Sequence, residues 1–311
     1  MRLFDTSEIK PEEIDGLGHM NVRFYMERAQ RANRALMAEL GLGPDATAPA
    51  RLVQHDTYTR YHREQFQGQV LAVEGGVLRA DADAIAAYFE VTNPAKGEIA
   101  ATFVLANSLV EPATGRTRPL PEAAVTSARA QVIEMPHHGR PRTLDLGAPR
   151  LDLAYDDVAA RLADDESDPM SRRSEWTVEA QSCDEHGFLA DSGAMMFGGW
   201  RQPSADEMRR HGPMTFVGDH GHRLGWASLE TRMVRVASPR AGDRLCSIGA
   251  EIGLHPKVRH SRRWLFNVTT GELVSLNDNV SIALDLDARR SIEIPPSIRS
   301  KLETRHTPEF A

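Results

Sequence analysis

An internal repeat constrains the fold of this chain more than any other sequence feature. The pattern Asp15-x-x-Gly18 in the first half recurs as Asp184-x-x-Gly187, about 169 residues later. Two further segments, near residues 110 and 280, resemble each other, and both end on an arginine-containing turn and a proline. A spacing of this length predicts an internal duplication, with each half forming one copy of the same fold.

The segment from residue 15 to 40 is predicted to be a tight turn followed by an amphipathic helix. Gly16 and Gly18 permit backbone geometry that residues with a Cβ resist, and Asn21 can cap the helix. Apolar residues recur every three to four positions, which predicts one buried helix face. The apolar stripe is Phe24, Ala29, Ala32, Leu36 and Leu40, with Arg28, Arg31, Arg34 and Glu39 mostly off it.

A carboxylate just before a helix N-terminus is suited to acyl transfer. The first amide N–H groups of a helix have no partner within it, and the helix dipole favours negative charge there. Asp15 lies seven residues before Val22, so a carboxylate nucleophile or base and backbone donors could flank one carbonyl carbon. The plainer alternative is that Asp15 is only a turn or capping residue.

Four segments after this helix alternate apolar and polar residues or carry β-branched runs, which predicts strands joined by short turns. They are residues 52–61, 69–81, 84–92 and 99–111. A short helix is expected within 116–131. The second half predicts strand or extended structure at 176–183 and 217–236, a possible helix at 190–200, and a hairpin over 261–287. The fold class is therefore α+β, with antiparallel sheets.

The pattern Asp15-x-x-Gly18-His19-x-Asn21, followed by Tyr25 and a helix, resembles the signature of hotdog-fold acyl-CoA thioesterases, especially the 4-hydroxybenzoyl-CoA thioesterase-like group. The stretch 57–70 is also similar to the family's second strand. The resemblance implies two tandem hotdog units, each a curved antiparallel sheet wrapped around a central helix, packed as a pseudo-dimer. The expected organisation is a first unit over 1–125, a connecting segment over 126–170 and a second unit over 171–311.

The resemblance also implies the chemistry, hydrolysis of an acyl-CoA thioester. Asp15 would attack the carbonyl or activate water, and the backbone N–H near Val22 would polarise the thioester oxygen. His19 and Asn21 would position the substrate or water, although His19 could equally be a structural histidine. Asp184 is the weaker second candidate, because Phe188 and Ala190 occupy the places of His19 and Asn21.

Coenzyme A phosphates need cations, and arginine suits bidentate contact with them. The candidate substrate-binding residues are Arg60, Arg63, Glu64, Arg259 and Arg262, with Lys257 and Arg263 near the last two. Glu64 has a second interpretation as a structural ion-pair residue. Exposed arginines at strand edges are common, so these residues are candidates by charge and position alone.

Composition limits the possible partners and location. The net charge of −7 provides no general attraction to nucleic acid or anionic lipid. No apolar run reaches the roughly 20 residues of a membrane span, and the charged N-terminus is unlike a signal peptide. With only Cys183 and Cys246, a reducing cytoplasm is expected. Neither cofactor nor metal is predicted, since His137–His138 and the group His211, His220 and His222 lack a recognisable ligand spacing.

Three alternatives to acyl-CoA hydrolysis remain open. Hydratases of the same fold carry Asp and His five residues apart, whereas Asp15 and His19 are four apart. Plant-type acyl-carrier thioesterases have an asparagine where this chain has Leu17, which favours a CoA substrate over a carrier protein. A duplicated fold could also be a non-catalytic acyl-CoA-binding protein. A homodimer of the whole chain is compatible with each of these.

Overall fold

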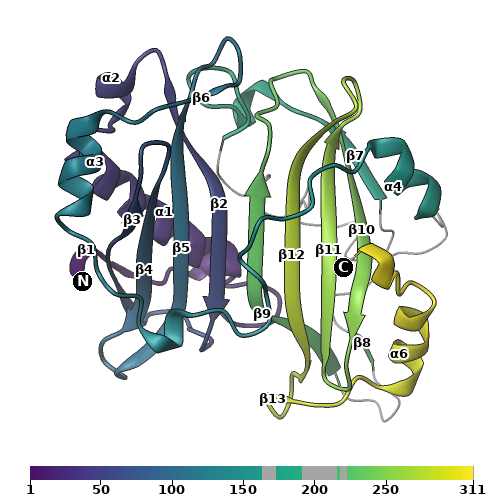
Figure 1. Ribbon diagram of the computed structural model, residues 1–311. Coiled ribbons are helices and arrows are strands. Elements are labelled where there is room, and N and C mark those ends of the chain that lie inside the picture. The colour runs from purple at the N-terminus through teal and green to yellow at the C-terminus, as the bar shows by residue number, and fades with distance from the viewer. Residues whose placement is uncertain (163–172, 191–215, 218–222, 311) are drawn as a thin grey trace. The chain divides into compact units, whose positions relative to one another are not determined.

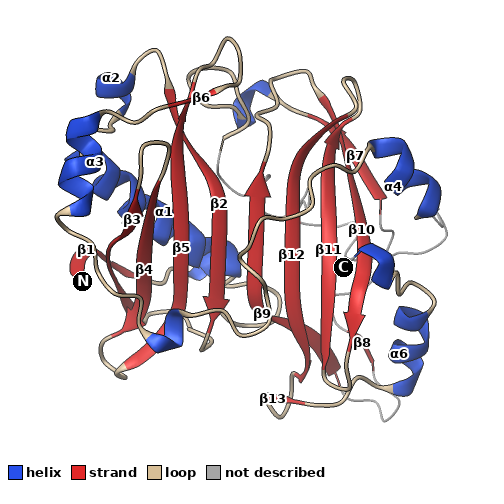
Figure 2. Cartoon of the chain, viewed as in Figure 1, coloured by secondary structure: helices blue, strands red, loops and turns tan. Residues whose placement is uncertain are grey.

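The computed structural model describes residues 1–162, 173–190, 216–217 and 223–310. They belong to two compact units, Met1–Arg142 and Thr143–Ala311. Most of the described secondary structure is antiparallel strand, with few helices (Figure 2). The predicted α+β class is therefore confirmed. The segment expected to connect the units, residues 126–170, is divided between them at Arg142.

The first unit is an antiparallel sheet in the order β1-β3-β4-β5-β2, with the short β6 paired to β5. Its strands are β1 Arg2–Glu8, β2 Arg51–Tyr61, β3 Val70–Ala80, β4 Ile85–Asn93, β5 Glu98–Val110 and β6 Thr117–Arg118. The four predicted strands after the helix correspond to β2–β5, and every end agrees within one residue. The short predicted helix is α3, Glu122–Arg129. No residue range was predicted for β1.

Helix α1, Val22–Glu39, lies across one face of this sheet and contacts β1, β3, β4 and β5 (Figure 1). Asn21 is its N-cap, and the Asn21 side chain accepts a hydrogen bond from the amide of Arg23 at 3.0 Å. The predicted buried stripe is largely confirmed. Arg28 is the exception, because it is only 2% exposed; a bidentate carboxylate partner, described below, makes its burial possible.

The core of the first unit lies between α1 and the sheet. Asn33 of α1 and Asn107 of β5 exchange side-chain hydrogen bonds at 2.8 and 3.2 Å, which identifies the sheet face toward the helix. Strand alternation then places Ile85, Phe89 and Phe103 on this face, and all three are fully buried. Burial of each aromatic ring contributes on the order of 2–3 kcal/mol.

The second unit has a sheet in the order β9-β12-β11-β10-β7, with β8 paired to β9 and β13 to β12. Its strands are β7 Arg173–Thr177, β8 Phe216–Val217, β9 Arg223–Arg235, β10 Arg244–Leu254, β11 Val258–Asn267, β12 Glu272–Asp285 and β13 Arg290–Ser291. The strand predicted over 176–183 ends early, because Ala180–Ser182 forms a 3-10 turn. The predicted helix at 190–200 lies almost wholly outside the described residues, as does the group His211, His220 and His222.

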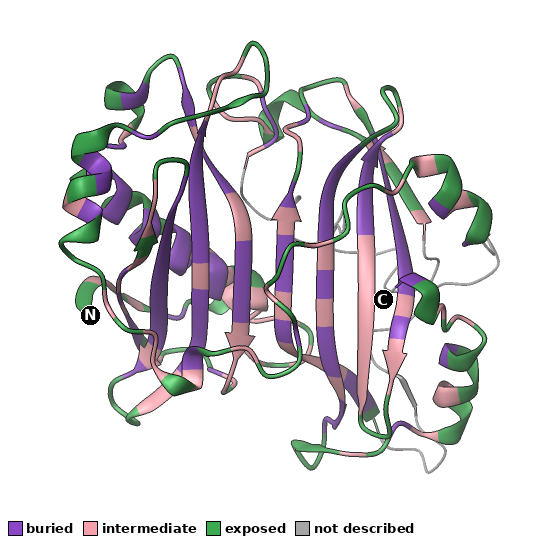
Figure 3. Cartoon of the chain, in the orientation of Figure 1, coloured by how far each residue is buried: buried purple, intermediate pink, exposed green. Residues whose placement is uncertain are grey.

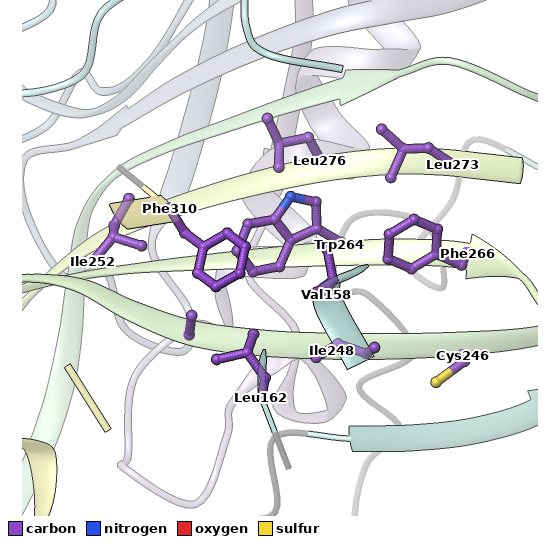
Figure 4. Close-up of a cluster of buried hydrophobic side chains, with 11 residues drawn as sticks. Val158, Leu162, Cys246, Ile248, Ile252, Trp264, Phe266, Leu273, Leu276 and Phe310 are labelled. Atoms are coloured by element: carbon purple, nitrogen blue, oxygen red, sulfur yellow. The ribbon is translucent and has the colours of Figure 1, made fainter. Parts of the chain in front are cut away.

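The hydrophobic cluster of the second unit lies between its sheet and segments from both ends of the unit. Trp264 and Phe266 of β11 share one buried cluster with Val158 of α4, Tyr155–Arg161, and Phe310 of the C-terminal 3-10 turn (Figure 4). Trp264 and Phe310 meet edge to face, with ring centroids 5.2 Å apart. A smaller cluster forms beneath α6, Pro296–Glu303.

Gly75 on β3 allows the Phe89 ring to lie flat against the sheet. A Cβ at this position would fall 2.3 Å from both the Phe89 ring and the carbonyl oxygen of Tyr88. We therefore expect Gly75→Ala to lower the free energy of unfolding by about 1–3 kcal/mol, measured by urea denaturation. Gly16→Ala is the matched control, since its added Cβ would meet nothing within 4 Å; equal effects of the two changes would contradict this account.

Candidate functional site

The Asp15 turn is a short closed loop just before α1. A bridge between Ile14 and Met20 closes it, and the amide of Asp15 donates to the carbonyl of His19 at 3.0 Å. Gly18 has φ +82° and donates its amide to the carbonyl of Asp15 at 3.0 Å. Only glycine adopts this conformation without strain, so the Asp-x-x-Gly spacing follows from the turn geometry.

The Asp15 carboxylate is held by donors on both oxygens. Oδ1 accepts the amide of Leu17 at 2.8 Å, and Oδ2 accepts the Asn21 side-chain amide at 3.4 Å. Asn21 thus uses its oxygen to cap α1 and its nitrogen to contact Asp15. The Asp15 side chain retains 21% exposure. A fixed, partly exposed carboxylate therefore stands beside the N-terminus of α1.

His19 lies between two carboxylates. Its Nδ1 is 3.7 Å from Asp15 Oδ2, and its Nε2 is 3.3 Å from Glu64 Oε1. Nδ1 also contacts the carbonyl oxygen of Met20 at 3.2 Å. Because a carbonyl oxygen only accepts, this contact assigns a proton to Nδ1. The structure thus brings together four of the predicted residues: Asp15, His19, Asn21 and Glu64.

The loop after β2 is tied to the Asp15 turn through backbone contacts. The amide of Met20 donates to the carbonyl of Gln65 at 2.8 Å, which sets Glu64 opposite His19. The buried Gln65 side chain accepts a hydrogen bond from Asn93 at 2.8 Å. Tyr25 donates its hydroxyl to the carbonyl of Arg63 at 3.4 Å, and burial raises its pKa, so it remains protonated.

A buried ion pair fixes the segment before the turn to α1. Arg28 donates from Nη1 and Nη2 to the two oxygens of Glu13, at 3.0 and 2.8 Å. Nη2 also reaches the carbonyl of Glu8, and Nε reaches the Ser7 hydroxyl. Glu13 belongs to the 3-10 turn Pro11–Glu13, and its own carbonyl accepts the amide of Asn21. Sequence reasoning missed this pair because the charge of Arg28 placed it on the solvent side.

Comparison with known proteins identifies this segment. Residues 9–128 match the family model of the thioesterase-like superfamily. Residues 9–128 belong to the thioesterase-like superfamily. The matched range includes the whole Asp15 turn, α1 and the loop that carries Glu64. The predicted resemblance is therefore confirmed. No curated protein sequence matches the chain.

Solved structures of thioesterases share the fold. A putative oleoyl thioesterase from Lactobacillus plantarum has a TM-score of 0.63 at 12% identity, covering 93% of this chain and 96% of that chain. The 12:0-ACP thioesterase from Umbellularia californica has 0.64 at 13%, covering 90% and 94%. An acyl-ACP thioesterase from Bacteroides thetaiotaomicron VPI-5482 has 0.60 at 11%, covering 89% and 96%. At these identities the likeness establishes the fold, the hotdog fold of thioesterases.

The second Asp-x-x-Gly turn repeats the backbone of the first, 169 positions later. Cys183 and Leu189 form the closing bridge, Gly187 has φ +78°, and the amide of Asp184 donates to the carbonyl of Phe188 at 2.7 Å. The side chains differ from those of the thioesterase-like segment. Asp184 Oδ1 accepts the amides of His186 and Phe188 at 2.9 and 3.0 Å. Where the first turn has His19, the second has Phe188, whose ring lies under Arg240.

The other two candidate residues of the thioesterase-like segment, Arg63 and Arg60, differ in their exposure and partners. Arg63 is exposed and adjacent to Glu64 in the chain. Arg60 lies on the sheet face opposite α1, where its Nη1 donates to the carbonyls of His138 and Arg140 at 2.8 and 3.1 Å. On that face His138 Nε2 is 2.5 Å from the buried Glu90. Arg60 therefore anchors the segment around residues 138–140 to the sheet.

Arg259 and Arg262 lie in the second unit and have partners there. Arg262 donates to both oxygens of Asp278 at 2.8 and 3.1 Å and to the carbonyl of Phe310. Arg259 donates to Ser281 and to Glu251, at 3.1 and 3.2 Å. Hydrogen bonds from His260 and Arg262 outweigh the effect of burial and lower the pKa of Asp278. Both arginines therefore have hydrogen-bond partners within the second unit.

The part of the chain that the structure describes contains neither a metal-ligand cluster nor a membrane-spanning helix. No group of three His, Cys, Asp or Glu side chains is placed to hold a metal ion. No described helix combines the length and apolar character needed to cross a bilayer.

The Arg28–Glu13 pair predicts a large effect of a single change. Arg28→Met would leave the Glu13 carboxylate partly buried without its partner, and we expect a loss on the order of 3 kcal/mol in the free energy of unfolding, measured by urea denaturation. Arg31→Met, which removes a half-exposed arginine of the same helix that pairs with Asp5, is the control. If the unpaired carboxylate causes this loss, adding Glu13→Gln to Arg28→Met should recover part of the free energy of unfolding. A double variant no more stable than Arg28→Met would contradict this explanation.

The lowered pKa of Glu13 predicts that the stability of the protein falls at acidic pH. Burial acts to raise its pKa, but hydrogen bonds from Arg28 and the amide of Lys10 hold the pKa below the ordinary 4.5. A lowered folded-state pKa stabilises the protein above the ordinary value, and this stabilisation disappears as the pH falls through the lowered value. The free energy of unfolding, followed from pH 6 downward, should therefore fall less steeply in Glu13→Gln than in wild type over that range.

Proposed function

We propose that the chain hydrolyses acyl thioesters at the Asp15 site, with acyl-CoA as the substrate class. The observation that carries this proposal is the fixed Asp15 carboxylate beside the N-terminus of α1, with His19, Asn21 and Glu64 around it. Membership of residues 9–128 in the thioesterase-like superfamily supports it. We also propose that the two units are tandem hotdog units that associate as a pseudo-dimer, as expected from the repeat.

In the proposed reaction, the Asp15 carboxylate and the N-terminus of α1 act on opposite sides of the thioester carbonyl. Asp15 accepts a proton from water as the water oxygen attacks the thioester carbon. The amide at Val22, which has no acceptor within the helix, donates to the oxygen that becomes negative in the tetrahedral intermediate. The C–S bond then breaks, giving the free acid and a thiolate that takes up a proton.

The neighbouring side chains orient the carboxylate. Asn21 contacts Asp15 while capping α1, so the carboxylate and the helix N-terminus have a fixed separation. His19, held between Asp15 and Glu64, would position the water or the substrate. In the alternative covalent route, Asp15 itself attacks the carbon and forms a mixed anhydride, which water then hydrolyses. A single turnover in ¹⁸O-labelled water distinguishes the two routes, since label in the Asp15 carboxylate requires the anhydride.

The carrier of the acyl group is the second part of the proposal. Arg63 is exposed beside Glu64 and can contact a phosphate of coenzyme A. Two proteins of this fold are named as acyl-ACP thioesterases, so carrier-protein substrates belong in the test. Leu17 stands where the plant-type enzymes have asparagine, which favours CoA. Arg63→Gln should raise the KM for acyl-CoA more than that for an acyl-pantetheine that lacks the nucleotide.

Thiol release from short, medium, long and aromatic acyl-CoAs and from acyl-ACP tests the activity. Asp15→Asn should lower kcat about 10²- to 10⁴-fold, because it removes a proton acceptor that acts in the transition state. Asp184→Asn is the matched control and should retain activity, since its turn lacks the histidine. If wild type binds acyl-CoA but cleaves no thioester, a binding protein replaces the enzyme; equal loss in both variants would contradict the assignment to the first turn.

A further inference from the structure

The two sheets differ most on the face that corresponds to the one α1 covers in the first unit. We call this the inner face. The strand registers align the units residue by residue: Phe89 pairs with Gly75 and Phe103, and Arg263 pairs with Gly249 and Asn277 in the same way. An arginine in the second unit therefore stands where the first has a fully buried phenylalanine.

The replacement covers much of the inner face, although Leu71 and Val91 of the first unit have the apolar counterparts Leu245 and Leu265. Seven of the positions that are apolar and fully buried in the first unit become polar, namely Val73, Val77, Ile85, Ala87, Phe89, Phe103 and Leu105. Their counterparts in the second unit are all polar, namely Ser247, Glu251, Arg259, Ser261, Arg263, Asn277 and Asn279. All but Ser247 keep part of their surface exposed, and Figure 3 shows this intermediate burial along much of β11. The second unit has its aromatic cluster around Trp264 on the other face.

The inner face carries two arginines, Arg259 and Arg263, near the single carboxylate of Glu251. Arg259 is paired with Glu251, with Nη1 and Oε1 3.2 Å apart, and its guanidinium lies over the Trp226 ring at 4.2 Å. Arg263 donates from Nη1 to the Ser247 hydroxyl at 3.1 Å. Among the described residues, no carboxylate lies within ion-pair distance of Arg263. Burial lowers the pKa of both arginines, and a bound anion would offset that cost.

Two acceptor atoms near these arginines are also without a hydrogen bond. Glu251 Oε2 and Asn279 Oδ1 are buried and have no partner among the described residues. Glu251 and Asn279 lie on either side of Ser261, in the neighbouring strands β10 and β12. Buried polar atoms usually have partners, and leaving one unpaired costs about 1–3 kcal/mol. The inner face thus offers free donors at Arg263 and two free acceptors nearby.

We propose that the inner face of the second unit binds a small carboxylate that also carries a hydroxyl or amide donor. The carboxylate would pair with Arg263, and the donor would reach Glu251 Oε2 or Asn279 Oδ1. A single uncompensated arginine favours a monoanion over a phosphate dianion, which the free oxygen of Glu251 would repel. This site shares no residue with the Asp15 site, so it does not depend on the proposed function.

Isothermal titration of the full chain tests the site, with 3-hydroxybutyrate, butyrate and inorganic phosphate as probes. We expect 3-hydroxybutyrate to bind at least about tenfold more tightly than butyrate, because only it satisfies a buried acceptor, and phosphate to bind most weakly. Arg263→Met should weaken 3-hydroxybutyrate about tenfold or more. Arg290→Met, at an exposed position of the same unit, should leave the affinity unchanged.

Asn279→Leu supplies a second variant, because it introduces the residue that the first unit has at this position. It should reduce the preference for 3-hydroxybutyrate over butyrate while retaining butyrate binding, because one of the two acceptors is removed. Circular dichroism will show whether each variant is folded. The proposal is wrong if neither carboxylate binds wild type at millimolar concentration, if Arg263→Met leaves the affinity unchanged, or if phosphate binds most tightly. Thioester hydrolysis is not part of these readouts, so failure here leaves the Asp15 proposal intact.

Discussion

The ion pair between Arg28 and Glu13 holds together the parts of the chain on which the Asp15 site depends. Arg28 extends from the buried side of α1 to the end of β1 and to the 3-10 turn before Asp15. Glu13 in turn receives the amide of Asn21 on its carbonyl, at the start of the helix. Turn, strand end and helix N-terminus therefore form one rigid assembly. The cost of burying the charges is offset by a fork of two hydrogen bonds.

Much of the fold could be predicted from the sequence because the responsible signals are local. Alternation located β2–β5 nearly to the residue, and Asn21 followed by an apolar stripe located α1. The local pattern mispredicts burial where a partner distant in the sequence allows a charged side chain to be buried. Arg28 has the sequence character of a surface residue and becomes buried only because Glu13, fifteen positions earlier, supplies a matching carboxylate.

The candidate site was predictable in part for the same reason. Asp15, Gly18, His19 and Asn21 lie within one turn, so their spacing alone indicates that they meet. Glu64 was also a candidate residue. Its position beside His19 depends on a backbone hydrogen bond between Met20 and Gln65, which no sequence pattern predicts. Arg60 shows the converse: its charge suggested a substrate contact, yet the structure places it on the opposite face of the sheet, bonded to carbonyl groups.

The reversed polarity of the second inner face has a consequence for how each half gains its stability. The first unit buries aromatic rings between sheet and helix, whereas the second buries Trp264 and Phe266 on its other face, against α4 and the C-terminal turn. Apolar burial produces the heat-capacity change of unfolding, so that change has a different structural source in each half. The two units thus have corresponding strand pairings but bury their aromatic clusters on opposite faces of those strands.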